Sequence, residues 1–123
     1  KDNHTHTLPE FDIPIFSKLY EFYKILSRLV IVFPKTQRYT LGQKLDNVTL
    51  EMMELLFSIP VATNKTDKLQ EISIKLDLLK ILLRLCRDTQ AINNKNYLDL
   101  QSLLQEIGKM LGGWIRSTKQ NSP

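Results

Sequence analysis

The chain of 123 residues is long enough for one domain with its own core and too short for a second. Seventeen Lys and Arg against thirteen Asp and Glu give a formal charge of +4, which favours polyanionic partners without proving them. The single cysteine, Cys86, excludes an internal disulfide framework and favours the cytoplasm, and because no apolar run approaches the roughly 20 residues that span a bilayer, we expect no membrane association.

The first 13 residues lack helical periodicity, so we expect a flexible leader at 1–13. His4 and His6 lie in this leader without a further ligand nearby, so we expect no metal site. A first helix is predicted over 15–32, because apolar residues recur there at helical spacing. These residues are Phe16, Leu19, Tyr23, Leu26 and Val30.

The segment FPKTQRYTLGQ at 33–43 ends one helix and begins the next. Pro34 ends the first helix, because proline restricts the preceding residue and cannot donate a helical hydrogen bond. Thr36 is one candidate N-cap, while Thr40 and Gln43 have the spacing of a capping box. The second helix should run from about Thr40 to Ile59. Its main apolar residues are Leu41, Leu45, Val48, Met52, Leu55, Leu56 and Ile59.

Lys35 and Arg38 make the same turn basic, with Tyr39 beside them and Lys44 just beyond. Such a turn is suited to binding phosphate, and Tyr39 with Arg38 is the one aromatic and cation pair we consider for base stacking. The alternatives are a solvated turn and a tyrosine that packs between helices.

Two further helices follow. Thr66 or Asp67 is expected to cap the third helix, and Asn93 with Asn94 marks the turn and cap before the fourth. The third helix buries Leu69, Ile72, Leu76, Leu79, Leu83 and Cys86, and the fourth buries Leu100, Leu104, Ile107 and Leu111, joined by Trp114 if the helix persists. Gly112 and Gly113 either end the fourth helix or allow another backbone to approach.

Four helices with short connections predict an all-α, antiparallel up-and-down four-helix bundle over 14–118, followed by a flexible tail at 119–123.

Two of these helices carry a second apolar face. The outward set is Leu50, Met53 and Phe57 on the second helix, and Ile74, Leu78, Ile81 and Leu85 on the third. Because each helix of a square bundle has one inward sector, a monomer would expose these residues, and we predict that they form a subunit interface. The alternative is that both helices are buried from two sides in a squat bundle.

Basic side chains form a ridge on the third helix. Lys80, Arg84 and Arg87 follow one another at spacings of four and three, which suits a phosphate backbone. Lys109 and Arg116 form a second pair on the fourth helix. The alternative is an ordinary solvated face on which Asp77 pairs with Lys80 or Arg84.

The chain offers no catalytic constellation that we recognise. Cys86 has no histidine at a helical spacing, and Glu51 with Glu54 fits the polar side of an amphipathic helix. No glycine-rich phosphate loop follows a strand. We therefore expect a binding protein without a cofactor, and no enzyme.

The motifs FPKTQRYTLGQKL at 33–45 and IGKMLGGWI at 107–115 resemble the accessory variability determinant (Avd) proteins of diversity-generating retroelements. The resemblance covers about residues 16–118. It implies a four-helix bundle that assembles as a ring-shaped homopentamer and works with a reverse transcriptase, its template RNA and complementary DNA. The interface and basic residues named above would serve these contacts.

Two other classes of protein are considered. The ribosomal RNA intervening-sequence proteins belong to the same wider group of four-helix bundles and would imply a ribosome-associated or RNA-associated role. A secreted helical signalling bundle is disfavoured by one unpaired cysteine and by short loops.

Overall fold

The computed structural model describes residues 14–120, and every regular element within this range is helical. The long helices are α1 (Pro14–Ile31), α3 (Gln43–Ser58), α4 (Lys65–Asp88) and α5 (Asn94–Gln120). The short α2 (Lys35–Gln37) and the π-helical turn η3 (Arg38–Gly42) precede α3, and the 3-10 turn η4 (Ile59–Val61) follows it. The expected all-α class is therefore confirmed, while the leader at 1–13 lies outside the described residues.

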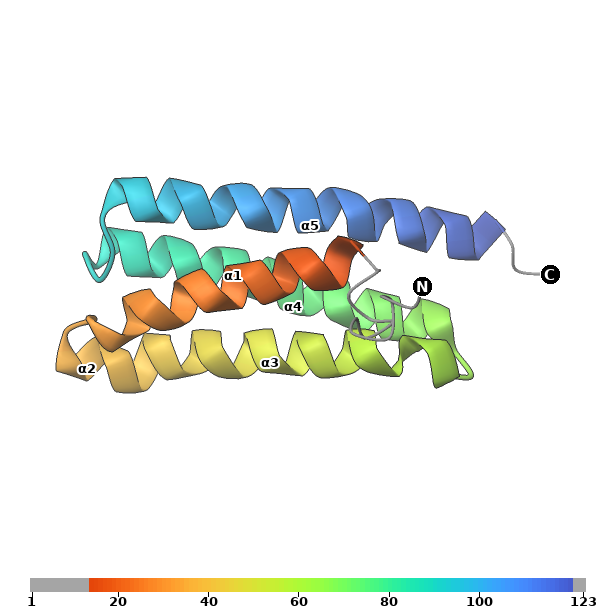
Figure 1. Ribbon diagram of the computed structural model, residues 1–123, viewed down its shortest axis with the longest axis horizontal. Helices are drawn as coiled ribbons and strands as arrows, with labels where there is room; N and C mark the ends of the chain where they lie inside the picture. Colours follow the sequence, from red (N-terminus) through yellow and green to blue (C-terminus); the bar gives the residue numbers. More distant parts are fainter. Residues whose placement is uncertain (1–13, 121–123) are drawn as a thin grey trace, which may run out of the picture.

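The four long helices lie side by side along one axis, and successive long helices run in opposite directions (Figure 1). Helix α1 contacts α3 and α5, and α4 contacts the same two helices. This arrangement is a square bundle, in which each helix turns one sector toward the common core. The α2 turn and the loop between α4 and α5 lie at the same end of the bundle (Figure 1).

The core agrees closely with the predicted stripes. All residues expected to be buried on α4 and α5 are buried, and Tyr97 joins them near the start of α5. Trp114 lies partly buried against this core. On α1 the buried set is shifted, because Ile15 and Phe22 are buried where Phe16 and Tyr23 were expected. Phe16 and Tyr23 flank the core and are half-buried.

The predicted capping box at the start of the second helix is wrong. The helical chain begins at Lys35, after Pro34, and no side chain caps it. Thr40 lies inside η3, and its hydroxyl donates to the Thr36 carbonyl at 2.9 Å, so neither threonine serves as the N-cap. The π-turn lies against α1 at the buried Gly42, where an added Cβ would come within 2.9 Å of Val30 Cγ1.

The N-cap predicted for the third helix, Thr66 or Asp67, is also wrong. Asn64 caps α4, because its Oδ1 accepts from the backbone N–H of Asp67 at 3.0 Å. The cap before α5 is confirmed, since Asn93 Oδ1 accepts from the Asn96 N–H at 2.7 Å.

Helix α5 passes through Gly112 and Gly113 and continues to Gln120, so the expectation that this pair ends the helix is wrong. The approach of another backbone is not seen either, because the nearest atoms to a Cβ at each glycine belong to the Arg116 side chain. Within residues 14–120, none of the helices combines the length and apolar character that crossing a bilayer requires.

Candidate nucleic-acid interface

A groove between α4 and α5 brings basic residues of both helices together. It has a volume of about 370 Å³, and Lys80 of α4 and Lys109 of α5 both line it. Gly108 and Gly112 also line the groove. Because glycine has no side chain, the backbone of α5 itself forms the wall at these two positions. A Cβ at Gly108 would lie 3.7 Å from Lys80 Nζ, so the ammonium group rests beside the bare backbone of α5. Two basic clusters that were separate in the sequence thus share one groove.

Arg116 extends this basic surface along α5. A Cβ at Gly112 would lie 3.5 Å from one terminal guanidinium nitrogen of Arg116, and a Cβ at Gly113 would lie 3.8 Å from the other. The guanidinium group therefore lies beside both glycines. Arg84 is exposed one helical turn beyond Lys80. These four cations belong to neighbouring helices, and two of them, Lys80 and Lys109, line the groove itself.

Arg87, the last member of the predicted ridge, differs from Lys80 and Arg84. Its guanidinium carbon lies 4.5 Å from the ring centroid of Tyr97, and its Nε donates to Asp88 Oδ1 at 3.0 Å. Arg87 is half-buried, so part of its binding capacity is used within the protein. We therefore assign it chiefly to joining α4 and α5.

Asp77 lines the same groove as Lys80. Across residues 14–120, it forms no ion pair with Lys80 or Arg84 within 4.0 Å, and Lys109 and Arg116 likewise lack ion-pair partners. Within this part of the structure, Asp77 therefore does not neutralise the charge of the ridge. The groove cations keep their hydrogen-bond donors available.

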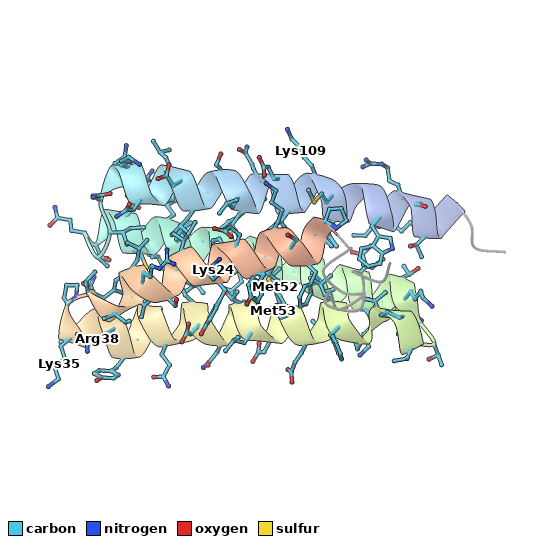
Figure 2. All side chains as sticks on the ribbon, viewed as in Figure 1. Lys24, Lys35, Arg38, Met52, Met53 and Lys109 are labelled. Carbon is cyan, nitrogen blue, oxygen red and sulfur yellow. The ribbon has the colours of Figure 1, made fainter. Side chains whose placement is uncertain are left out.

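The turn cluster of Lys35 and Arg38 lies at the end of the bundle, away from Lys109, as Figure 2 shows. Tyr39, which follows Arg38 in the same turn, is 60% exposed, so the expectation that its side chain packs between helices is wrong. Arg38 is half-buried with its guanidinium carbon 5.8 Å from the Tyr39 ring centroid. The structure therefore separates this cluster from the groove between α4 and α5.

The predicted interface residues form two apolar surfaces, one on α3 and one on α4. On α3, Leu50, Met53 and Phe57 line a groove of about 770 Å³ with Phe16 of α1. Glu51 and Glu54 also line it, and the Glu51 carboxylate is paired with Lys75 at 3.0 Å. On α4, Ile74, Ile81 and Leu85 are exposed. Leu78 and Met53 are half-buried and pack against the core, which corrects the expectation that Leu78 faces only a neighbour. Their partial burial follows from their place at the edge of the outer sector.

Cys86 lies in the core, where burial raises the pKa of its thiol from 9.0 to about 11. The thiol is therefore protonated at neutral pH and is a poor nucleophile. Within residues 14–120, no group of three or more His, Cys, Asp or Glu side chains is placed to hold a metal ion. His4 and His6 lie outside the described residues.

Sequence reasoning overlooked the groove itself, although a signal was available. Gly108 and Gly112 are four residues apart, which places them on one face of a helix, and that face meets α4. The pairing of Arg87 with Tyr97 had no comparable signal, because it depends on how the ends of α4 and α5 meet.

The fold and the groove together define a small helical-bundle protein with a basic surface shared by two helices. The bAvd-like family model matches residues 15–118, and the chain belongs to this family. The predicted resemblance to Avd proteins is thereby confirmed. No curated protein matched the chain in sequence.

Proposed function

We propose that the protein is an oligomeric accessory factor for a retroelement reverse transcriptase and its template RNA. It would act during mutagenic reverse transcription that diversifies a target gene, and it would perform no chemistry itself. Membership of the bAvd-like family supports this proposal. The single observation that carries it is the groove in which Lys80 and Lys109 lie together without ion-pair partners among the described residues.

The proposed mechanism is electrostatic capture. Lys80, Arg84, Lys109 and Arg116 would contact phosphates of the RNA, and of complementary DNA once it forms, and release bound counterions. Phosphate contacts carry no sequence information, so most of the affinity would be independent of sequence. The basic turn at Lys35 would supply a second contact region for RNA or for acidic surfaces of the polymerase.

The apolar surfaces on α3 and α4 would meet between subunits and close a ring. Exposed apolar area of this kind usually marks a partner surface, and a head-to-tail contact between two different surfaces generates rings when the rotation closes. The number five rests on the family resemblance alone. Repetition around a ring would multiply the basic groove and raise its avidity for a long polyanion. We place the assembly in the cytoplasm, where a free thiol such as Cys86 stays reduced.

Salt dependence tests the groove. Changing both Lys80 and Lys109 to Ala should weaken binding to single-stranded RNA and flatten the plot of log affinity against log salt. The expected change in slope is about 0.7 for each phosphate that the protein no longer neutralises. Lys65→Ala with Arg28→Ala is the matched control, because it removes the same charge from exposed positions outside the groove that form no ion pair among the described residues. Equal slopes in the two double variants would contradict the assignment of the groove.

Copurification tests the polymerase partner. The unaltered protein should retain a retroelement reverse transcriptase, and the Lys80 and Lys109 variant should retain less at moderate salt. Failure of the unaltered protein to bind either the polymerase or RNA would refute the proposed function.

Light scattering tests the ring. The unaltered protein at micromolar concentration should have a mass of about five chains. Ile74→Glu with Ile81→Glu should give monomers of unchanged helical content, because these side chains are 69% and 55% exposed. Ile31→Glu is the control, since Ile31 is 67% exposed on α1, outside both apolar surfaces. A monomeric mass for the unaltered protein would exclude the assembly.

A further inference from the structure

One carboxylate lies inside the basic groove between α4 and α5. Asp77 lines the groove together with Lys80 and Lys109. It precedes Lys80 by three residues, so the two side chains are neighbours on one side of α4. A negative charge at this position repels phosphate and lowers the affinity of the groove for any polyanion. A ligand that carries a hydrogen-bond donor beside its phosphate would turn this cost into a gain.

The Asp77 carboxylate is available to such a donor. Asp77 is exposed, and within residues 14–120 it forms no ion pair within 4.0 Å. Glu51 and Glu106 differ from it, because each pairs with a lysine of another helix, at 3.0 Å and 2.6 Å. An ionised carboxylate without a partner is a strong hydrogen-bond acceptor. The groove therefore offers one free acceptor beside its two cations.

The rest of the lining suits a sugar. Ser73 and Gln105 contribute a hydroxyl and an amide to the groove. A Cβ at Gly108 would lie 3.5 Å from Leu76 Cδ2 and 3.7 Å from Lys80 Nζ, so the missing side chain leaves space between an apolar surface and an ammonium group. The volume of about 370 Å³ is at the lower end of the range for small ligands, about 300–1,000 Å³. The apolar residues of the lining are Leu76, Leu111 and Ile115.

We propose that this groove binds the ribose as well as the phosphate of single-stranded RNA, with Asp77 accepting a hydrogen bond from the ribose 2′-hydroxyl. The inference rests on the proposed function. The 2′-hydroxyl is a donor that DNA lacks, and it belongs to the sugar that joins two successive phosphates. An acceptor one helical turn from the phosphate-binding Lys80 matches that arrangement. Dinucleotide-binding enzymes likewise use an acidic side chain to bind a ribose 2′-hydroxyl near their pyrophosphate site.

The groove would therefore prefer RNA to DNA, and this preference has a distinct dependence on salt. Lys80 and Lys109 contact phosphates that both kinds of strand possess, so added salt should weaken the binding of both strands with the same slope. The hydrogen bond from an uncharged hydroxyl releases no counterion. The ratio of the two affinities should therefore stay constant as the salt concentration rises.

Fluorescence anisotropy with the full chain tests the inference. The probes are labelled uridine oligomers of one length, in which every sugar carries a 2′-hydroxyl, a 2′-hydrogen or a 2′-fluorine. The hydroxyl strand should bind at least about fivefold more tightly than the deoxy strand, which is the effect of one hydrogen bond of ordinary strength. The fluoro strand keeps the sugar conformation of RNA but has no donor, so it should bind like the deoxy strand.

Two variants locate the preference. Asp77→Ala should abolish it, and should bind the deoxy strand more tightly than the unaltered protein does, because the repulsion of phosphate is gone. Asp77→Asn keeps a neutral acceptor oxygen and should retain part of the preference. Glu71→Ala is the matched control, because it removes one exposed negative charge from α4 outside the groove and should change the affinity of every strand alike. Circular dichroism should show unchanged helical content in all three variants.

The outcomes separate this inference from the function on which it rests. Equal, salt-dependent binding of the hydroxyl and deoxy strands would overturn the ribose contact and leave the proposed function intact. A fluoro strand that binds like the hydroxyl strand would also overturn it, because the groove would then recognise the shape of the sugar. A full preference for RNA in Asp77→Ala would exclude Asp77 as the acceptor. Absence of any RNA binding would refute both the inference and the proposed function.

Discussion

The side-chain amide of Gln37 donates hydrogen bonds to both oxygens of Thr89, at 2.8 Å to the hydroxyl and 3.2 Å to the carbonyl. This contact joins α2 to the C-cap of α4 and so places the basic turn relative to the end of the ridge at Arg87. Two segments that are distant in the sequence are thereby held at one end of the bundle.

Gln37→Ala should lower the free energy of unfolding by about 0.5–1.5 kcal/mol, the usual contribution of such hydrogen bonds. Denaturation in urea measures this change. Gln70→Ala serves as the control, because Gln70 is exposed on α4 and forms no side-chain hydrogen bond to another element within residues 14–120. Equal stability of the two variants would show that the Gln37 contact contributes little in solution.

Gly42→Ala should destabilise the protein by about 1–3 kcal/mol, the usual cost of overpacking a core. The new methyl group would lie 2.9 Å from Val30 Cγ1, and a β-branched valine has little freedom to turn away. The better helix propensity of alanine offsets at most about 1 kcal/mol of this cost.

Gly113→Ala is the matched control for Gly42→Ala and should change the stability of the protein in the opposite direction. Its nearest neighbour would be Arg116 at 3.8 Å, an ordinary contact with the end of a flexible side chain. The substitution should therefore raise stability by up to about 1 kcal/mol through helix propensity. A loss of stability here would mean that α5 does not continue through this glycine pair in solution.

Arg87→Ala should cost about 0.5–2 kcal/mol of stability, because the guanidinium group lies over the ring of the buried Tyr97. Arg84→Ala should stay within about 0.5 kcal/mol, as expected for an exposed side chain. Thermal denaturation of the two single variants compares these effects directly. Similar melting temperatures would argue that the contact with Tyr97 is weak. A triple change of Lys80, Arg84 and Arg87 to Ala is therefore expected to destabilise the fold through the loss of the Arg87 contact.

Alkaline pH should weaken the fold through Cys86. The pKa of its thiol is raised from 9.0 to about 11 in the folded chain. The stability that the protonated thiol contributes is therefore fully present below pH 9, where the thiol of the unfolded chain is also protonated, and it is lost as the pH rises through 11. Between these values the thiol should reduce the free energy of unfolding by up to about 1.4 kcal/mol per pH unit. Tyr23, whose pKa is also raised, chiefly by burial, acts in the same direction above pH 10.

Urea denaturation from pH 8 to pH 11 measures this slope, and Cys86→Ala is the comparison. The variant should be less stable at neutral pH, because it loses buried volume, yet its stability should fall less steeply above pH 9. Parallel curves for the two proteins would mean that the thiol titrates normally in the folded state.

The periodicity of apolar residues determined much of this fold. The stripes through Leu69 to Cys86 and Leu100 to Leu111 predicted the buried faces of α4 and α5, and Pro34 located the end of α1. The exposed positions of Ile74 and Ile81 followed from the same helical geometry. These features depend on spacing along one helix, so the sequence contains them directly.

Only the tertiary structure decided which residues share a site. Lys80 and Lys109 meet because α4 and α5 are neighbours and because Gly108 leaves the space between them open. The π-turn at Gly42 follows from close packing against Val30, which no local propensity encodes. Contacts between helices depend on three-dimensional packing, whereas the position of each helix depends on its own residues.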